Sequence, residues 1–524
     1  MRKLAYTGKT NFMIKDVVMG PVLGFRGLKN GHWYTSALVV LQKTAEPPRL
    51  RFIYDSFSKA EENKVLLKTY ADHYVWRLDW SVSQTSWEQV ITYAVNEGPT
   101  YHYTVPAQNS SLRICYGSCF GVHTLQDINK LKKKNALWHV LQQVHQAKPY
   151  HLFVLGGDQV YSDQVWEKVP ALRQWLGQSL KKRLQASFTP DMQQQVAAFY
   201  FNLYCKMWRQ KRPAAVLSQI PTLMMWDDHD IFDGWGSYVP ELQACAVFQG
   251  IYQQAQEHFH VFQLQAQDHA DLGAAIPLGK NGFTYAHRLN DVLIIALDLR
   301  SERTRDQVLS LETHQSLQTW LASQFETKPV DGTSSSTGCK HILVLSGIPI
   351  VNADLTLLEA VLELRPGQQR MEDDLKDQWL SRAHQEERLR LIQWLFRISQ
   401  EFNCQVTILS GDAHLAFTGY LQTQDKNILD SAVQTIHQLT SSAMVNVPPP
   451  SLVIYMMEKL LAGKTEKVDD QISAYLQNFP GTNRHLIGAR NWLSLSINEE
   501  ATILAEWYVE GEKQPYSKII EPLQ

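Results

Sequence analysis

The sequence predicts an α/β core preceded by a region of antiparallel strands. Between about residues 10 and 105, short apolar runs alternate with polar residues and end at turns, as in "HWYTSALVVLQ" and "TYHYTVPA". This alternation is typical of half-buried strands, and several in a row favour an antiparallel sandwich. After residue 112, nearly continuous apolar runs such as "HLFVLGGD" and "CQVTILSGDAH" alternate with helix-compatible segments. Strands buried on both faces have this pattern, which indicates an α/β fold.

Residues 386–402 predict a helix, because apolar side chains recur there with a 3.6-residue period and the segment leads directly into the next strand. The Gln-rich segments 165–215 and 240–268 are helix-compatible inserts. They flank two of the motif-bearing loops, so they form either a lid or a wall of the site, although their aromatic residues favour a core. Residues 331–338, "DGTSSSTG", predict a flexible loop.

A chain of 524 residues is long enough for more than one domain. We expect an N-terminal β-sandwich domain over residues 1–108 and an α/β domain over residues 109–450. We expect the C-terminal extension, 451–524, to pack on the α/β domain. The segment 447–490 includes a short amphipathic stretch, for which contact with a membrane surface is the less favoured alternative.

Composition and charge exclude several classes of protein. The net charge of −2 excludes a strongly basic protein that coats nucleic acid, and no apolar window is long enough for a transmembrane helix. The N-terminal "MRKLAYTGKTNFMIKD" lacks the apolar run of a signal peptide. Six scattered cysteines suit free thiols in a reducing compartment. These observations predict a cytoplasmic protein.

The apolar runs end in side chains that bind cations. In open α/β folds the loops after neighbouring strands converge at one edge, so these side chains are expected to meet there. Carboxylate oxygens bind highly charged cations, imidazole suits transition metals, and a thiolate or phenolate favours a ferric centre. The polar residues that follow the runs are Cys119, Asp158, Tyr161, Asp163, Asp228, His229, Asp230, Asp298, Arg300, Arg303, Asp412 and His414.

Each of these features has a structural alternative. A single Gly-Asp after a strand is most often a turn or a helix N-cap, whereas "GDQVYSD", "WDDHD" and "SGDAH" together favour a ligand site. Asp298 and Arg300 are explained equally well by a structural ion pair. Cys119 is either a metal ligand or a small buried hydrophobe, with equal weight. For Asp227 we expect a helix cap or an acceptor behind the ligands.

The ordered motifs also carry a family resemblance. The chain resembles the PhoD-type alkaline phosphatase family, a branch of the metallophosphoesterases, over about residues 110–450, and its N-terminal β region resembles that of the same family. The resemblance implies a metallophosphoesterase-type αββα sandwich core with an N-terminal antiparallel β-sandwich domain. It also implies a metal-dependent hydrolase of phosphoric mono- or diesters. The motifs are "YGSCF", "LGGDQVYSD", "WDDHDIFDGW", "LDLRSER", "DLKDQWLSRAHQEER" and "LSGDAH".

The resemblance implies a site with two metal ions, iron together with Ca, Mn or Zn. Asp158 would bridge the ions, and Cys119 and Tyr161 would complete the shell of the iron. Asp228 would bind the second ion, with His414 and Asp412.

The resemblance also implies the catalytic residues. His229 would assist the leaving group, and Asp230, which replaces the family's usual Glu, would orient His229. Arg300 would clamp phosphate oxygens unless it forms the structural ion pair. The substrate would be a small-molecule or lipid phosphate ester. The alternative is a non-catalytic binding protein on a retained phosphoesterase scaffold, which the Asp230 substitution weakly favours.

Overall fold

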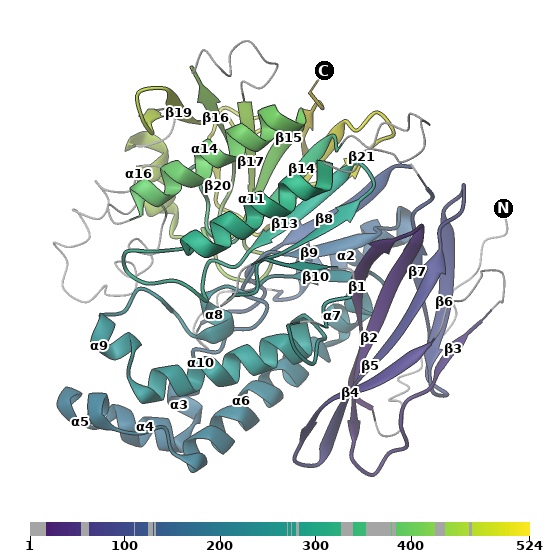
Figure 1. Ribbon diagram of the computed structural model, residues 1–524, viewed down its shortest axis with the longest axis vertical. Helices are drawn as coiled ribbons and strands as arrows, with labels where there is room; N and C mark the ends of the chain where they lie inside the picture. The colour runs from purple at the N-terminus through teal and green to yellow at the C-terminus, as the bar shows by residue number, and fades with distance from the viewer. Residues whose placement is uncertain are drawn as a thin grey trace.

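The computed structural model in Figure 1 contains two large β-sheets with helices around them. The N-terminal run 1–16, the expected loop 331–338 and most of the "DLKDQWLSRAHQEER" motif lie outside the residues that the structure describes. The described residues are 17–53, 62–108, 110–123, 129, 131, 133–269, 271–273, 275–278, 282–325, 339–352, 379, 384–424, 435–460 and 464–523.

The first sheet combines strands from the beginning, the middle and the end of the chain. Its ten strands are β1 (Val17–Lys29), β2 (His32–Gln42), β4 (Asn63–Tyr70), β5 (His73–Ser83), β8 (Leu112–Gly117), β9 (Leu152–Leu155), β10 (Thr222–Met224), β21 (Asn491–Ile497), β22 (Ile503–Val509) and β23 (Tyr516–Ile520). They lie in the order β23-β22-β21-β8-β9-β10-β1-β2-β5-β4. The central strands β8, β9, β10 and β1 are parallel, and both flanks are antiparallel.

The N-terminal strands are antiparallel to one another, but their sheet continues into the α/β core. Strand β1 pairs in parallel with β10, where Gly24 lies opposite Thr222. The strands β3 (Leu50–Phe52), β6 (Gln89–Val95) and β7 (Thr100–Val105) form a separate small sheet. It packs against β5, with Trp80 Nε1 donating to Tyr103 Oη at 2.7 Å. The domain boundary at residue 108 therefore stays a prediction.

The second sheet has a parallel centre. Its ten strands are β11 (Ile276–Pro277), β12 (Tyr285–Leu289), β13 (Val292–Leu297), β14 (His341–Ser346), β15 (Gln405–Ser410), β16 (Ala416–Thr423), β17 (Thr435–Ser441), β18 (Thr465–Lys467), β19 (Ile472–Leu476) and β20 (Leu486–Ile487). Strands β13, β14, β15 and β17 run parallel in this order. Strand β20 pairs with β16 at the antiparallel end.

The two sheets pack on each other through apolar side chains, and helices cover their other faces. One core includes Ile114 and Val154 of the first sheet together with Leu345 and Leu439 of the second. Helices α11 (Leu311–Phe325) and α14 (Gln385–Phe402) cover the second sheet, and α2 (Ala136–Ala147) and α7 (Lys211–Leu217) cover the first (Figure 1). The predicted α/β class is confirmed.

Helix α14 shows how the sequence pattern produces this layer. Its predicted stripe is found: Ile392, Leu395 and Phe396 are buried against the second sheet. The helix ends at Asn403, whose φ of 48° lies in the left-handed region that Asn tolerates at a C-terminal cap. The next strand, β15, begins two residues later and carries the "SGDAH" loop to the edge of the sheet.

The segments predicted as inserts contain helices that lie together at the bottom of Figure 1. Trp175, Tyr200 and Trp208 are buried there, so most of these aromatic side chains belong to the core. Among the described residues, none of the helices combines the length and the apolarity needed to cross a bilayer. The helices that lie together in the two inserts are α3 (Val165–Lys168), α4 (Pro170–Leu176), α5 (Leu180–Gln185), α6 (Pro190–Trp208), α9 (Pro240–Gln243), α10 (Ala246–His258) and the π-helix η1 (Phe259–Gln263). A further helix outside the inserts, α16 (Ser451–Leu460), follows β17.

Candidate metal and catalytic site

The loops that follow β8, β9, β10 and β15 meet at one edge of the two sheets. Four of their residues adopt left-handed backbone conformations: Cys119 at φ 55°, Asp158 at 58°, Asp412 at 59° and His414 at 50°. Residues other than Gly rarely occupy this region, and such strain clusters at functional sites. The chain therefore turns sharply after β8, β9 and β15 and places polar side chains in the same volume.

Asp158 lies at the centre of this cluster. Its Oδ2 accepts weak hydrogen bonds from Cys119 Sγ at 3.4 Å and from Tyr161 Oη at 3.3 Å. Its Oδ1 is buried and accepts no hydrogen bond from any described residue. Tyr161 Oη also lies 3.4 Å from His414 Nε2 and accepts from Asn446 Nδ2 at 2.9 Å. Since a buried carboxylate oxygen normally has a donor, Asp158 Oδ1 is positioned for a cation.

Two groups of potential metal ligands share Asp158. Cys119, Asp158 and His414 form one group, and Asp158, Asp228 and His229 form the other, with ligand atoms within 4.8 Å of one another in each. The arrangement agrees with a bridging position for Asp158. The grouping differs in one respect from the ligand set that the resemblance implies. His414 is grouped with Cys119, whereas the resemblance places it with Asp228. Asp412 falls outside the groups found among the described residues.

The electrostatics of the cluster also fit a cation. Burial raises the pKa of Asp158 well above its usual value, and the carboxylates of Asp228 and Asp227 raise it further. Asp228 accepts from the Gly234 amide at 2.8 Å through Oδ2, and its buried Oδ1 lies 3.4 Å from Arg300 Nη2. Burial raises the pKa of Asp228, but the charges of Arg300 and His229 outweigh it and lower that pKa below its usual value. A carboxylate that is costly to ionise, as Asp158 is, is stabilised by a bound positive charge. The residues present therefore fit a metal centre.

His229 is held by Asp163, not by Asp230 as expected. Its Nδ1 lies 3.0 Å from both carboxylate oxygens of Asp163, and its ring stacks on Tyr161 with centroids 4.3 Å apart. Burial lowers the pKa of His229, but the charges of Asp163, Asp228 and Asp158 outweigh it and raise the pKa well above its usual value. The neighbouring carboxylates therefore favour the protonated form of His229, and Asp163 fixes the orientation of its ring.

The expectation that Asp230 orients His229 is wrong, because the carboxylate of Asp230 has other partners. Asp230 lies in the short helix α8 (Asp228–Ile231), from which its side chain turns back towards the loop after β9. It accepts four hydrogen bonds, from the amides of Asp158, Val160 and Asp227 and from Gln263 Nε2, at 2.9 to 3.1 Å. Asp230 thus positions the Asp158 loop and has no oxygen left for His229.

Arg300 is ion-paired, but the pairs found join it to Asp227 and Asp228, whereas the expected pair was with Asp298. The role of Arg300 as a phosphate clamp stays a prediction. The side chain is 0% exposed; its Nε donates to Asp227, and its Nη2 lies 3.4 Å from Asp228 Oδ1. Asp227 itself caps α8, as expected of a helix cap. Its tight fit requires Gly157 (φ +112°), where an added Cβ would lie 2.7 Å from the Asp227 Cβ.

The sequence did not indicate two further side chains of the site, His123 and Asn446. His123 lies with its ring centroid 4.3 Å from that of His229, and with Asp163 and His229 it forms a third potential ligand group. Asn446 donates to Tyr161 from a distant loop. A weak signal existed for His123, because it lies four residues after Cys119 in the same strand-end loop, whereas Asp163 was already among the candidates. Asn446 had no such signal.

The fold and the cluster together define an α/β protein with side chains of metal-binding types at the carboxyl ends of its strands. Family comparison then identifies the group to which it belongs. A family described as PhoD related phosphatase matches residues 81–362 and 328–466 of this chain. Because the match spans more than half of the sequence, the chain belongs to this family, in agreement with the resemblance.

Two individual proteins are similar to the chain. The uncharacterized protein YGR266W of Saccharomyces cerevisiae is 26% identical over 505 residues, which cover 80% of this chain and 70% of the yeast protein. The solved structure of PhoD superposes with a TM-score of 0.58 at 13% identity, covering 98% of this chain and 90% of that chain. At this identity the second likeness shows a shared fold.

Proposed function

We propose that the protein is a metal-dependent phosphoric ester hydrolase with a dinuclear metal centre. The observation that carries the proposal is Asp158, a buried carboxylate shared by two ligand groups, with one oxygen that accepts no hydrogen bond from the described residues. Membership of the PhoD related phosphatase family supports the same chemistry. The metallophosphoesterase-type αββα core with an N-terminal β-sandwich domain, and the cytoplasmic location, belong to this proposal as predictions.

The side chains divide the chemical tasks. Bound metal ions would neutralise phosphate oxygens and lower the pKa of an attacking water. Cys119, Asp158 and His414 would hold one ion, while Asp158 and Asp228 would hold the other. His229, kept protonated by Asp163, would donate a proton to the departing oxygen. Its ring lies against Tyr161, so it is held in place before the substrate arrives.

The ligand types favour iron at one position. A thiol and a phenol both approach Asp158 Oδ2, and soft or phenolate ligands suit iron better than Ca²⁺ or Mg²⁺. The group around Asp228 is richer in carboxylates and would accept Ca, Mn or Zn. The substrate would be a small-molecule or lipid phosphate ester, either a mono- or a diester.

The non-catalytic alternative loses one of its two weak motivations, the other being the expected absence of a leader. The one that is lost is Asp230 in place of Glu, since a shorter side chain was expected to hold His229 poorly. In the structure Asp163 holds His229, and Asp230 has four donors of its own. The substitution therefore leaves the proposed proton donor in place.

The decisive experiment combines metal analysis with turnover. We expect the purified protein to contain about two metal ions per chain and to hydrolyse p-nitrophenyl phosphate or its bis-ester. His229→Ala should keep the metals and lose most of the turnover, whereas Asp158→Asn should lose both. His102→Ala, at an exposed histidine of β7, is the matched control and should change neither. Absence of bound metal, with turnover unchanged in Asp158→Asn, would contradict the metal-dependent hydrolase. A protein that hydrolyses neither ester would leave the non-catalytic binding protein.

A further inference from the structure

A cavity of about 440 Å³ adjoins the candidate site. Tyr161 belongs to both: its hydroxyl bonds to Asp158, and the residue also lines the cavity. Gly121 and Val122, from the loop that leads from Cys119 to His123, line the same side. The opposite walls come from α3, α4 and α6 of the first helical insert. A molecule in this cavity therefore touches the residues that surround the proposed metals.

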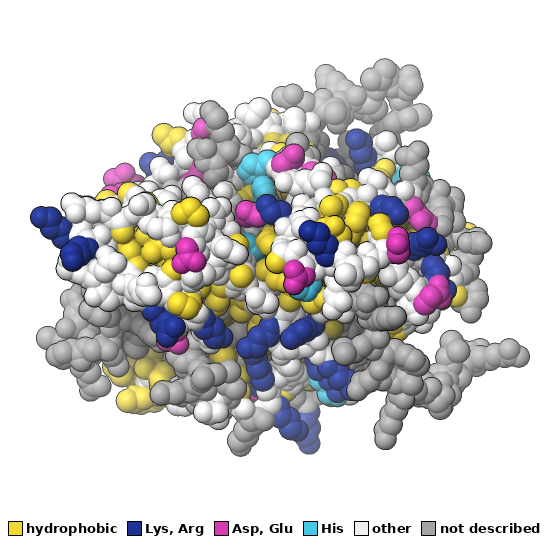
Figure 2. Space-filling model, turned by 90° about the horizontal axis from the view of Figure 1, so that it is seen from below, with side chains coloured by type: hydrophobic (Ala, Val, Ile, Leu, Met, Phe, Trp, Pro, Cys, Tyr) yellow, Lys and Arg dark blue, Asp and Glu magenta, His cyan; other side chains and the backbone are white. Residues whose placement is uncertain are grey.

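Three lysines line this cavity: Lys134 before α2, Lys168 at the end of α3 and Lys206 in α6. No described Asp or Glu lines it, and none of the three ammonium groups forms an ion pair with a carboxylate in the described part of the chain. They come from separate segments, so their convergence is a property of the fold. Lys and Arg side chains also gather across the lower middle of the face shown in Figure 2.

The lysines influence one another. Partial burial lowers the pKa of Lys134 and that of Lys168, and the positive charge of Lys206 lowers both further. Like charges placed together around a cavity raise the free energy of the empty protein. A bound anion relieves this repulsion, and burial of the surrounding surface strengthens the attraction.

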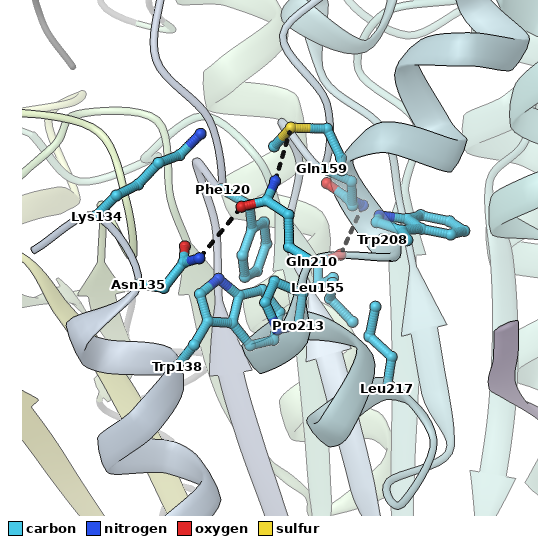
Figure 3. A pocket seen from close by; sticks show the side chains of 11 residues that line it. Phe120, Lys134, Asn135, Trp138, Leu155, Gln159, Trp208, Gln210, Pro213 and Leu217 are labelled. Carbon is cyan, nitrogen blue, oxygen red and sulfur yellow. Dashed lines mark hydrogen bonds between the residues drawn. The ribbon is translucent and has the colours of Figure 1, made fainter. Parts of the chain in front are cut away.

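The size of the cavity matches the organic part of a substrate. Small-molecule sites usually measure about 300 to 1,000 Å³, so this cavity holds a sugar-sized group with a charged substituent. The adjacent recess in Figure 3 is different, because it offers only about 10 Å³ between Phe120, Trp138 and Leu217. In that view Lys134 points away from these apolar side chains. The recess has room for about one water, so the larger cavity is the binding space.

We propose that Lys134, Lys168 and Lys206 form a subsite for a second phosphate group on the substrate. This inference rests on the proposed function: while one phosphate is hydrolysed at the metals, the organic part fills the cavity and carries another phosphate to the lysines. Val122, Phe199 and Met207 supply apolar wall for the part between the two phosphates. The enzyme would thus prefer bisphosphates over esters that carry one phosphate.

The test compares two esters of the same sugar, fructose 1,6-bisphosphate and fructose 6-phosphate. We expect Lys168→Ala/Lys206→Ala to lower kcat/KM for the bisphosphate about tenfold or more, and that for the monophosphate less than about twofold. The matched control is Lys181→Ala/Lys182→Ala in α5, which removes the same charge at exposed positions outside the cavity. An equal loss for both esters, or an equal effect of the control, would overturn the subsite.

A second phosphate is present both in soluble bisphosphates and in membrane headgroups. A further arm therefore uses vesicles containing phosphatidylinositol 4-phosphate, with phosphatidylinositol vesicles as the reference. Lysine-dependent hydrolysis in either arm supports the subsite and tells which source is used. If Lys168→Ala/Lys206→Ala leaves the rate of hydrolysis unchanged in both arms, the subsite is rejected.

Binding separates this inference from the proposed function. Titration calorimetry with fructose 1,6-bisphosphate, carried out on proteins that also carry His229→Ala, measures the lysine contribution to binding with most of the turnover removed. If no ester is hydrolysed but the bisphosphate binds about tenfold more weakly to Lys168→Ala/Lys206→Ala than to the control, the subsite stands and the hydrolase does not. If p-nitrophenyl phosphate is hydrolysed but bisphosphate binding is the same in both variants, the hydrolase stands and the subsite is refuted.

Discussion

Two sets of buried aspartates lie within the same strand-end region, and they differ in what surrounds their oxygens. Asp298 accepts five hydrogen bonds, from Trp226 Nε1, the amides of Phe283, Arg300 and Ser301, and the Ser301 hydroxyl. Asp230 accepts four. Asp158, by contrast, has a buried Oδ1 that accepts no hydrogen bond from the described residues, and the buried Oδ1 of Asp228 has an ion pair with Arg300 Nη2 at 3.4 Å.

The difference separates carboxylates that hold the fold together from carboxylates that are available to a ligand. A buried charge with a full set of donors is stabilised by the protein, so its removal leaves those donors unpaired. A buried oxygen without a donor is costly in the isolated protein and is stabilised by an added cation. The following substitutions test this division, beginning with the largest expected effect.

Asp158→Asn should reduce turnover by at least about 10³-fold, because the bridging carboxylate is lost. Asn tolerates the left-handed backbone at this position and keeps the shape of the side chain. The free energy of unfolding of chelator-treated protein should therefore change by less than about 1 kcal/mol. Steady-state kinetics and urea unfolding provide the two measurements. A large loss of stability would place Asp158 with the structural carboxylates.

Asp298→Asn, unlike Asp158→Asn, should strongly lower the free energy of unfolding. The new amide presents N–H groups where several donors now point, so the free energy of unfolding should fall by about 3 kcal/mol or more. Asp291→Asn, an exposed position just before β13, is the control and should change stability by less than about 0.5 kcal/mol. Urea unfolding of the two variants checks the prediction. A stable Asp298→Asn protein without metal would instead mark Asp298 as a ligand.

Metal binding should raise the free energy of unfolding only when Asp158 is intact, because its Oδ1 is the buried oxygen that is available to a cation. At a free metal concentration 100 times its Kd, the free energy of unfolding should rise by about 2.7 kcal/mol in the wild type. The same addition should leave the Tm of Asp158→Asn nearly unchanged. Thermal unfolding with and without chelator measures both. An equal shift in the two proteins would show that the metal binds elsewhere.

Sequence reasoning found the candidate ligands but not the groups that contact them, for a physical reason. Cys119, Asp158, Asp228 and His414 meet because carboxyl ends of parallel strands converge, and strand ends are visible in an apolar pattern. Whether an acid at a strand end is saturated depends on donors from distant segments. Asp298 and Asp158 both follow buried strands, and only the packed structure distinguishes them.

Other features were outside the reach of the sequence for the same reason. The join between β1 and β10 depends on pairing across about 200 residues, which local alternation cannot specify. The contact of Asp163 with His229 depends on side-chain directions in two loops. The three cavity lysines lie in separate segments with ordinary surface composition, so only the fold shows that they converge.

Asp163→Asn tests whether Asp163 raises the pKa of His229 and whether His229 is the proton donor. Removing the charge should reduce turnover by about 10- to 100-fold while leaving the metal content unchanged. Since Asp163 raises the pKa of His229, its loss should lower that pKa. A proton donor is lost as pH rises through its pKa, so the alkaline limb of the kcat profile should move to lower pH. An unmoved limb would show that another group donates the proton.

The smallest effect is expected from substitution of Gln263, which lies outside the site. It donates a hydrogen bond to Asp230, a carboxylate that already accepts three other hydrogen bonds. Its Nε2 donates to Asp230 Oδ1 and to Tyr204 Oη, both at 2.9 Å. Gln263→Met keeps the length of the side chain but removes its donor, so the free energy of unfolding should fall by about 1 to 2 kcal/mol. The three amides that hold Asp230 remain, so the Asp158 loop should keep its position and kcat should change less than about twofold. If kcat instead fell as steeply as in Asp163→Asn, the hydrogen bonds of Asp230 would directly affect turnover. Structural carboxylates such as Asp230 could then not be separated from candidate ligands such as Asp158.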